Sequence, residues 1–435
     1  FTIAWDSQQK KWFHLYSDEH IKSNNPLHWS KHFFTWNVSC AECHSTDVKK
    51  NYNASTKTYD TRYHEINVGC QSCHGPGKAH IAWAHKHEPS DHHSRIVKTP
   101  MQKIEQCARC HSRRHPVSID DRFGDAFLDH FMPALLRSDL YYPDGQIKEE
   151  VYVYGSFLQS KMYRLGVTCI DCHNPHSLQL VAKGNSLCAQ CHNPQGNSRF
   201  QSLPKKLYDN PSHHHHQPNS AGAQCVNCHM PTTTYMTIDP RRDHRFGIPR
   251  PDLTISIGVP NACNRCHRDQ SATWAQQQIE QWFGKRQRGD EFAHVFAKAQ
   301  ANTLPSANPL ITIATDSQQA SIVRATATQL LLPFEDKMAL KAKLHLLTDK
   351  NALIRVAAVR SLANVPPASV TSDLLPLLHD PIRAVRIEVA SILAGTPKHL
   401  IPSAQQDAFE KVMQEYQALQ ESNRDLASGY FNLGN

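Results

Sequence analysis

Every cysteine of this chain belongs to one short pattern, C-x-x-C-H, in which a histidine directly follows the second cysteine. Seven copies of the pattern use all 14 cysteines, and we number them boxes 1 to 7 in chain order. Two thiols three positions apart can bond the two vinyl groups of one haem while the neighbouring imidazole reaches its iron. The sequence therefore predicts seven covalently attached haem c groups. The predicted attachment residues are Cys40, Cys43, Cys70, Cys73, Cys107, Cys110, Cys169, Cys172, Cys188, Cys191, Cys225, Cys228, Cys263 and Cys266, and the predicted proximal iron ligands are His44, His74, His111, His173, His192, His229 and His267.

Structural zinc is the alternative interpretation of repeated C-x-x-C units. Zinc takes four thiolate or imidazole ligands in a tetrahedral site, but it does not require a histidine after each second cysteine. Seven units also cannot be divided evenly into pairs. Disulfides within a box would be strained. Haem therefore explains the pattern better than zinc or disulfides.

Histidines outside the boxes are candidates for the second axial ligand of each iron. Of 29 histidines, 22 lie outside the boxes, and 18 of these precede residue 268. This excess favours ligation of each iron by two imidazoles. The run His213 to His216 is expected to supply at least one ligand, and the pairing of candidates with boxes is left open. The candidate distal ligands are His14, His28, His64, His80, His130, His176, His214, His215 and His244.

The elements that position these ligands must be short. Residues 40 to 267 contain all seven boxes, which leaves little chain for an ordinary apolar core. The porphyrins themselves would fill the interior, with short helices and loops around them. Between boxes 3 and 4, residues 140–146 have the composition of a hairpin turn, and the alternation from Ile147 to Tyr154 predicts a strand.

The formal net charge of +8 does not indicate a nucleic-acid partner. Each haem brings two propionates, which together would offset most of this charge. The arginine pairs 113–114 and 241–242, with Arg245, are expected to bind such propionates. The sequence has no apolar run of 18 residues, so we predict no transmembrane segment. Haem attachment to such boxes takes place outside the cytoplasm, so we expect a periplasmic or extracellular protein from which a leader was removed or the N-terminus was trimmed.

Three stretches around boxes carry a family resemblance: GCQSCHGPG at 69–77, VTCIDCHNPH at 167–176 and PNACNRCH at 260–267. Together they resemble bacterial multihaem cytochromes of the cytochrome c-552/4 superfamily that end in HEAT-like and tetratricopeptide repeats. The resemblance covers roughly residues 1 to 270. It implies a haem-packed fold related to the tetrahaem electron acceptor of hydroxylamine oxidoreductase, with stacked haem pairs, and distal ligand roles for His80 and His176.

The chain after residue 271 has a different composition and a repeat. Arg324, Arg355 and Arg386 are 31 positions apart, and Asp349 and Asp380 keep the same spacing. This period predicts stacked helical hairpins that resemble short HEAT-like repeats, with an ordinary helical bundle as the alternative. The predicted fold class is thus mainly α: a haem-packed multihaem cytochrome domain with little regular structure at 1–270, and an α-helical HEAT-like solenoid at 271–425. Residues 426–435 look like the start of a tetratricopeptide repeat, which we expect to continue beyond residue 435.

These features together predict an electron carrier rather than an enzyme. Electrons would pass through seven mostly bis-histidine haems between a donor and an acceptor protein outside the cytoplasm. The alternative is a reductase or oxidase of a small nitrogen or sulfur substrate at one five-coordinate haem. A further hypothesis is self-association into extracellular filaments, in which one subunit lends a histidine to its neighbour's iron.

Overall fold

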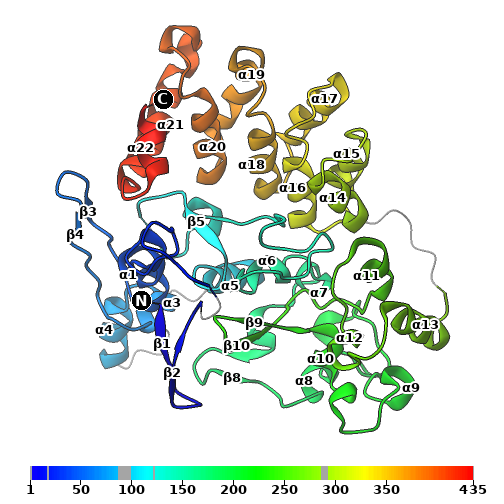
Figure 1. Cartoon of the computed structure of the whole chain (residues 1–435). Helices are drawn as coiled ribbons and strands as arrows, with labels where there is room; N and C mark the ends of the chain where they lie inside the picture. The colour runs from blue at the N-terminus through cyan, green and yellow to red at the C-terminus, as the bar shows by residue number, and fades with distance from the viewer. Residues whose placement is uncertain (1, 17–18, 87–98, 121–122, 286–291, 435) are drawn as a thin grey trace.

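The chain is mainly helical. Figure 1 shows its computed structural model, which describes residues 2–16, 19–86, 99–120, 123–285 and 292–434. The helices before residue 271 are short and separated by loops. Those from residue 292 onward are longer and follow one another in an arc above the rest of the chain (Figure 1). The predicted mainly α fold class is confirmed.

Each box forms a helical turn. In box 1, for example, the N–H of Cys43 donates to the carbonyl of Cys40 at 3.2 Å. Residues three apart lie on one side of a helical turn, so the two thiols of a box point the same way. The helices of this part are α1 (Trp36–Ser39), α2 (Ala41–His44), α3 (Cys70–His74), α4 (Lys78–Lys86), α5 (Pro100–Ala108), α6 (Tyr154–Phe157), α7 (Lys161–Arg164), α8 (Ser186–Ala189), α9 (Pro211–His214), α10 (Cys225–His229), α11 (Pro251–Ile257) and α12 (Cys263–Cys266), with 3-10 turns η1 (His32–Phe34), η2 (Phe127–Asp129), η3 (Cys169–Asp171), η4 (Ser198–Phe200) and η5 (Ala221–Ala223).

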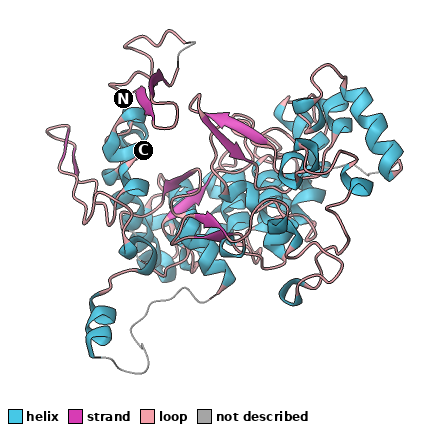
Figure 2. Ribbon diagram, turned by 90° about the horizontal axis from the view of Figure 1, so that it is seen from below, coloured by secondary structure: helices cyan, strands magenta, loops and turns pink. Residues whose placement is uncertain are grey.

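The strands form separate two-stranded antiparallel sheets, scattered among the helices in Figure 2. Each hairpin stabilises a short loop and does not form part of a larger sheet. The pairs are β1 (Ile3–Asp6) with β2 (Lys11–His14), β3 (Tyr52–Asn53) with β4 (Thr58–Tyr59), β5 (Arg114–Pro116) with β6 (Phe131–Pro133), β7 (His173–Asn174) with β8 (Gln179–Leu180), and β9 (Thr232–Tyr235) with β10 (Asp239–Arg242).

The turn predicted at 140–146 is present, because Tyr141 and Ile147 form an antiparallel bridge. The strand predicted from Ile147 to Tyr154 is wrong. Within this described stretch, Ile147 and Tyr152 make isolated bridges, Tyr152 has a left-handed φ of 60°, and Tyr154 begins α6. Ile147 and Tyr154 are both buried in the main apolar core, so tertiary packing overrides the local alternation.

The C-terminal helices pack in sequence: α15 contacts α16, α16 contacts α18, α18 contacts α20, and α20 contacts α21. Their apolar faces are buried between neighbours, as the helical periodicity requires. By contrast, α13 (Ala272–Phe283) packs on α11 and α12 of the part that carries the boxes (Figure 1). The later helices are α14 (Phe292–Gln300), α15 (Asn308–Thr315), α16 (Ser321–Gln329), α17 (Lys337–Leu346), α18 (Ala352–Ser361), α19 (Pro367–Leu374), α20 (Arg383–Leu393), α21 (Ser403–Ser422) and α22 (Ala427–Gly434), with η6 (Leu375–His379) and η7 (Lys398–Leu400).

The arginines of the 31-residue period connect one part of the helical arc to the next. Each arginine binds an acidic side chain 25 to 29 positions later in the chain. The third partner departs from the period, because a glutamate in α21 takes the place of the expected aspartate. The ion pairs are Arg324–Asp349 at 2.5 Å, Arg355–Asp380 at 2.7 Å and Arg386–Glu415 at 3.0 Å.

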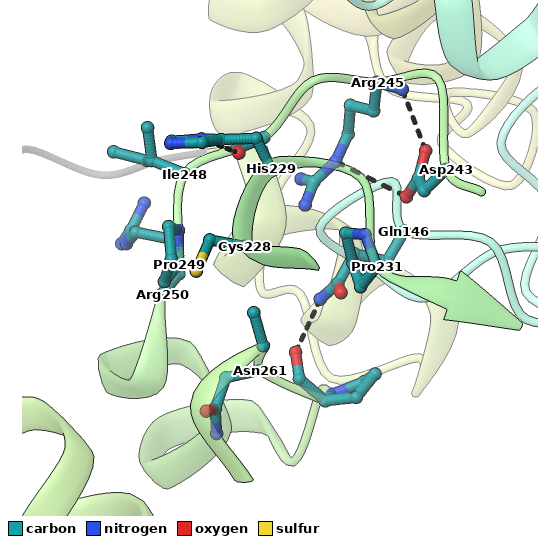
Figure 3. Close-up of a pocket in the computed structure, with 13 residues that line it drawn as sticks. Gln146, Cys228, His229, Pro231, Asp243, Arg245, Ile248, Pro249, Arg250 and Asn261 are labelled. Atoms are coloured by element: carbon teal, nitrogen blue, oxygen red, sulfur yellow. Dashed lines mark hydrogen bonds and ion pairs between the residues drawn. The ribbon is translucent and has the colours of Figure 1, made fainter. Parts of the chain in front are cut away.

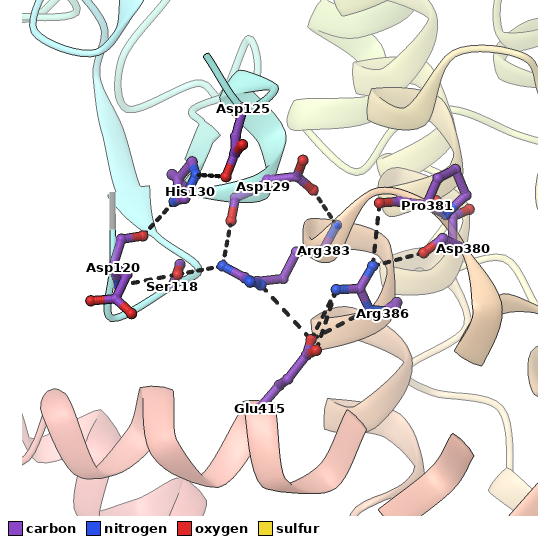
Figure 4. Close-up of polar contacts among 10 residues, drawn as sticks. All are labelled: Ser118, Asp120, Asp125, Asp129, His130, Asp380, Pro381, Arg383, Arg386 and Glu415. Atoms are coloured by element: carbon purple, nitrogen blue, oxygen red, sulfur yellow. Dashed lines mark hydrogen bonds and ion pairs between the residues drawn. The ribbon is translucent and has the colours of Figure 1, made fainter. Parts of the chain in front are cut away.

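One apolar core spans both parts of the chain. Buried side chains between residues 104 and 158 and between residues 295 and 419 belong to the same cluster. Polar contacts reinforce it: the N–H of Leu136 donates to Thr326 Oγ1 at 3.1 Å, and the N–H of Arg383 donates to Asp129 Oδ1 at 2.8 Å. Figure 4 shows Arg383 reaching from α20 to Ser118 and η2. The helical arc is therefore packed firmly onto the segment between boxes 3 and 4.

A second contact joins the end of the arc to the β3–β4 hairpin. Lys50 Nζ lies 2.8 Å from Asp425 Oδ1, and the hydroxyl of Tyr59 donates to Asp425 Oδ2 at 3.1 Å. The Asp425 side chain is only 2% exposed. Among the described residues, no helix is both long and apolar enough to cross a membrane.

Candidate haem-binding sites

The boxes before residue 175 lie next to one another in space. Neighbouring boxes share direct contacts between their own residues or residues within two positions of them. Three of these contacts are hydrogen bonds: between Thr46 Oγ1 and Ser72 Oγ at 2.9 Å (boxes 1 and 2), from Cys43 Sγ to the Cys110 carbonyl at 3.9 Å (boxes 1 and 3), and from Gln106 Nε2 to the Ser72 carbonyl at 2.8 Å (boxes 2 and 3). Boxes 3 and 4 are joined by the packing of α5, which contains Cys107, against η3, which contains Cys169.

The remaining boxes continue the series. Gln190 in box 5 donates to the carbonyl of Asp171 in box 4 at 3.0 Å. The N–H of Cys225 in box 6 donates at 2.9 Å to Oδ1 of Asn185, which lies three residues before box 5. Figure 3 shows the small cavity between boxes 6 and 7, lined by Cys228 and His229 on one side and by Asn261 on the other. Arg265 of box 7 donates to the carbonyl of Thr232, which lies three residues after box 6. The seven boxes therefore form one series of neighbours.

Four box histidines face a second histidine from elsewhere in the chain. The two rings of each pair are at most 39° from parallel, and their centres lie 6.0 to 6.3 Å apart. The sequence left this pairing open. The pairs are His74 (box 2) with His176, His173 (box 4) with His244, His229 (box 6) with His213, and His267 (box 7) with His216.

This spacing fits two imidazoles that bind one metal ion. An imidazole nitrogen binds a metal at about 2 Å, so two rings on opposite sides of one ion have their centres roughly 6 Å apart. Direct stacking of two rings without an ion would bring them closer, as His215 and Trp282 show at 4.3 Å. The four pairs therefore leave room for an iron between the rings.

The hydrogen bonds of several paired histidines leave Nε2 of the ring free to bind a metal. Nδ1 of His229 faces the carbonyl of Gly247 at 2.9 Å, and Nδ1 of His244 faces the carbonyl of Arg242 at 3.0 Å. His216 uses its Nδ1 in the same way, toward a carbonyl of its own turn. A ring nitrogen that faces a carbonyl must carry the proton, so the lone pair of Nε2 remains available to a metal.

Burial keeps several of these rings neutral, which is the form that binds metal. It lowers the pKa of His244 to about 4, because the charged imidazolium loses its hydration. Burial also lowers the pKa of His111, His173, His213 and His229. Neutral rings need no proton loss before they coordinate an ion.

Other predicted candidates are placed differently. Nδ1 of His14 accepts the N–H of Tyr16 at 3.1 Å, and Nδ1 of His214 accepts the N–H of His216 at 3.2 Å. A ring that accepts at Nδ1 carries its proton on Nε2, so these two rings need another tautomer to bind iron through Nε2. Nδ1 of His28 lies 2.8 Å from the hydroxyl of Ser30 and 3.4 Å from its backbone nitrogen.

The last four candidates have other contacts or surroundings in this structure. Both ring nitrogens of His130 contact oxygens, one of them Asp125 Oδ2 at 3.2 Å. His80 packs on Trp83, His215 packs on Trp282, and His64 is exposed at the surface. Their roles as ligands stay predictions. From the four-histidine run the structure brings forward His213 and His216 instead of His214 and His215, a choice for which the run itself holds no sequence signal.

The arginines expected to bind propionates already have protein partners. Arg114 Nη1 lies 2.7 Å from Glu42 Oε2, and Arg241 Nε lies 2.7 Å from Asp239 Oδ2. Arg242 donates to two backbone carbonyls near the end of α10. Binding of propionates by these side chains therefore stays a prediction.

The exposed apolar side chains give a further test of whether the residues around the boxes are suited to bind haem. Most large apolar side chains that remain exposed lie before residue 271. Leu178, Leu180 and Val181 follow box 4, and Ile66 and Val68 precede box 2. A flat apolar porphyrin would cover such side chains and supply the missing core. Among the described residues, no group of three or more His, Cys, Asp or Glu side chains is arranged to hold a metal ion by itself. The residues present fit haem.

Comparisons with known proteins agree with this chemistry. The family described as cytochrome c554 and c-prime matches residues 3–75, which contain boxes 1 and 2. The family described as a doubled CXXCH motif matches residues 164–197, which contain boxes 4 and 5. Among solved structures, the chain is similar to the crystal structure of the outer cell wall cytochrome OcwA, with 17% identity, a TM-score of 0.44, and coverage of 95% of this chain and 81% of that chain. A search of curated proteins found no match.

These findings support a multihaem cytochrome of the c type with covalently bound haem and iron. They also support electron transfer by haem as the general function. The two family matches together cover boxes 1, 2, 4 and 5, and the remaining boxes rest on the same sequence pattern.

Proposed function

We propose that the chain carries seven haem c groups and conducts electrons between a donor and an acceptor protein outside the cytoplasm. Haem, when bound, supplies an iron that changes between the ferrous and ferric states. The observation that carries the proposal is the series of contacts that joins each box, or the residues beside it, to the next. Groups attached to neighbouring boxes would be close enough to exchange electrons without a mobile carrier.

The order of contacts defines the route. Boxes 1 and 2 both touch box 3, and from there the series runs through boxes 4, 5, 6 and 7. The ends of the series are the places where partner proteins would dock. Cys70 and Cys73 of box 2 and Cys266 of box 7 are exposed, as an exchange of electrons with a partner requires.

The four histidine pairs support bis-histidine ligation at boxes 2, 4, 6 and 7. In each pair the chain itself provides both ligands, which leaves no open position for a small substrate. A reductase or oxidase would need such a position, and boxes 1, 3 and 5 are where it should be sought. The pairing at the other four boxes favours a conductor of electrons over an enzyme.

The C-terminal part supports a scaffold role. Its consecutive packing and its 31-residue ladder of ion pairs are typical of HEAT-like repeats. We propose a haem domain at 1–270, a solenoid at 271–425 and the start of a tetratricopeptide repeat at 426–435. Assembly into extracellular filaments is a second possibility for the exposed end boxes, and it would extend the same route from subunit to subunit.

Intact mass and electron paramagnetic resonance test the proposal together. The mass of the holoprotein should correspond to seven attached haems. The oxidised protein should show low-spin signals that account for at least four of them. A lower haem count would overturn the seven-haem proposal, and a high-spin signal that is lost when nitrite or hydroxylamine is added would favour an enzyme.

A further inference from the structure

The four-histidine run forms a turn that reaches two different boxes. α9 ends at His214, His215 follows with a left-handed φ of 56°, and His216 leaves in a new direction. The ring of His213 lies 6.3 Å from that of His229 in box 6, at an angle of 3°. The ring of His216 lies 6.0 Å from that of His267 in box 7.

The backbone explains how residues three apart can face different boxes. In a continuous helix, His213 and His216 would lie on the same face. The left-handed residue between them ends the helix and turns His216 away. Such a backbone conformation persists in a residue other than glycine only where the surroundings hold it.

α13 supplies those surroundings. The ring of Trp282 stacks on His215 with centres 4.3 Å apart and planes at 8°, and the ring of Phe283 lies 5.8 Å from that of His213. At the other end of α13, Trp274 lies 5.0 Å from the ring of His267. One helix therefore contacts both the turn and the proximal ligand of box 7.

The inside of the turn is also closed. A Cβ at Gly222 would collide with the ring of His216. Nδ1 of His216 forms a hydrogen bond with the carbonyl of His214. Nε2 of His216, on the other side of the ring, is therefore free to bind a metal. The ring of His216 is thus held from two sides.

We propose that the turn 213–216 supplies distal ligands to two neighbouring irons, His213 to that of box 6 and His216 to that of box 7, and that Trp282 is the positioning residue that holds the turn. This inference rests on the proposed function, because it requires haem at both boxes. It makes a single short turn the link between the last two haems of the series.

Ligand replacement in the full-length, haem-loaded protein tests the inference. His213→Ala and His216→Ala should each convert one haem per chain from low spin to high spin, and the double variant should convert two. His214→Ala is the matched control from the same turn and should convert none. All variants should keep the wild-type haem count by mass, because the attachment residues are unchanged.

The positioning role has its own readout. Trp282→Ala should shift the reduction potentials of two haems or raise their high-spin fraction, whereas Trp282→Phe should restore the wild-type spectrum. Gly222→Ala should affect one haem only, through His216. Unchanged spectra in both His213→Ala and His216→Ala, or an equal change in His214→Ala, would overturn the inference. If the wild-type protein still carried seven haems, the proposed function would stand. A wild-type protein without haem at boxes 6 and 7 would overturn both.

Discussion

The histidines that we propose as distal or proximal ligands differ from other histidines in the ring nitrogen that their surroundings leave free. His244 and His229 each turn Nδ1 toward a backbone carbonyl, which fixes the proton there and leaves Nε2 for an iron. His14 has the opposite arrangement, since its Nδ1 accepts the N–H of Tyr16 at 3.1 Å. All three residues are histidines, so the hydrogen bond at Nδ1 is what distinguishes the proposed ligands from the other histidine.

Replacement of His244 tests this criterion at a single residue. His244→Ala should leave the iron of box 4 with one protein ligand, so a high-spin signal equal to one haem per chain should appear. The control His14→Ala should leave the spectrum unchanged. Electron paramagnetic resonance of the oxidised proteins measures both, and a high-spin signal in the control alone would reverse the assignment.

The pH dependence of stability follows from the same burial. The pKa of His244 is lowered to about 4 in the folded chain, below the ordinary value of about 6.5. The unfolded chain therefore binds more protons between these values, so stability is complete above pH 6.5 and falls as the pH drops toward 4. This one group accounts for on the order of 3 kcal/mol at the acid end.

Guanidinium unfolding at pH 7.5 and pH 5.0 checks the direction. The free energy of unfolding should be lower at pH 5.0, and the difference should be smaller in His244→Ala. Coordination of iron acts in the same sense, because a protonated imidazole cannot bind it. Equal pH dependence in the wild type and the variant would rule out His244 as a contributor.

At the scale of elements, the ion pairs of Arg324, Arg355 and Arg386 fix the position of each part of the helical arc relative to the next. Arg355 in α18 binds Asp380, which precedes α20, and it also donates to the carbonyl of Asp349 from the preceding pair. The side chains of Arg355 and Asp380 are 12% and 4% exposed. A buried charge that loses its partner is costly because it keeps the desolvation penalty without the attraction.

Arg355→Ala should therefore lower the free energy of unfolding by about 3 to 5 kcal/mol. The matched control is Arg137→Ala, which breaks the exposed ion pair with Asp139 and should cost less than about 1 kcal/mol. Denaturant unfolding followed by far-ultraviolet circular dichroism measures the helices concerned. A similar small loss in both variants would mean that the ladder does not stabilise the arc.

At the scale of the whole molecule, the haem-bearing part and the helical arc share one core. Tyr141 and Tyr154, between boxes 3 and 4, lie in the same apolar cluster as Ile322 and Val356 of the arc. Gly155 lies at the contact, where a Cβ would meet the Tyr141 hydroxyl and approach Ile322. The arc therefore supports the segment that carries box 3 at one end and box 4 at the other.

Overpacking at this contact should destabilise the entire chain. Gly155→Ala is expected to cost about 1 to 3 kcal/mol, because neither neighbour can move without opening the core. Gly395→Ala is the control, since nothing lies within 4 Å of its added methyl group. Haem absorbance and helical circular dichroism should lose their signals together in Gly155→Ala. Two separate transitions would indicate that the parts unfold independently.

The haem boxes and the helical period could be read from the sequence because both depend on local spacing. Thiols three positions apart meet one haem wherever the box lies, and a 31-residue repeat presents the same apolar face each time. The mainly α class followed from these two signals. The strand predicted from Ile147 to Tyr154 failed, because burial against the helical arc decides the conformation of that segment.

The partners of the box histidines were decided by the tertiary structure alone. His176 is 102 positions from His74, and His244 is 71 positions from His173, so only the packing of distant loops can bring each pair together. Within the four-histidine run, the left-handed backbone at His215 directs the rings of His213 and His216 toward two different boxes. The predicted haem attachment depends on adjacent residues, whereas the proposed second ligand depends on how distant parts of the chain fold together. This is why the sequence predicted the first and left the pairing of the second open.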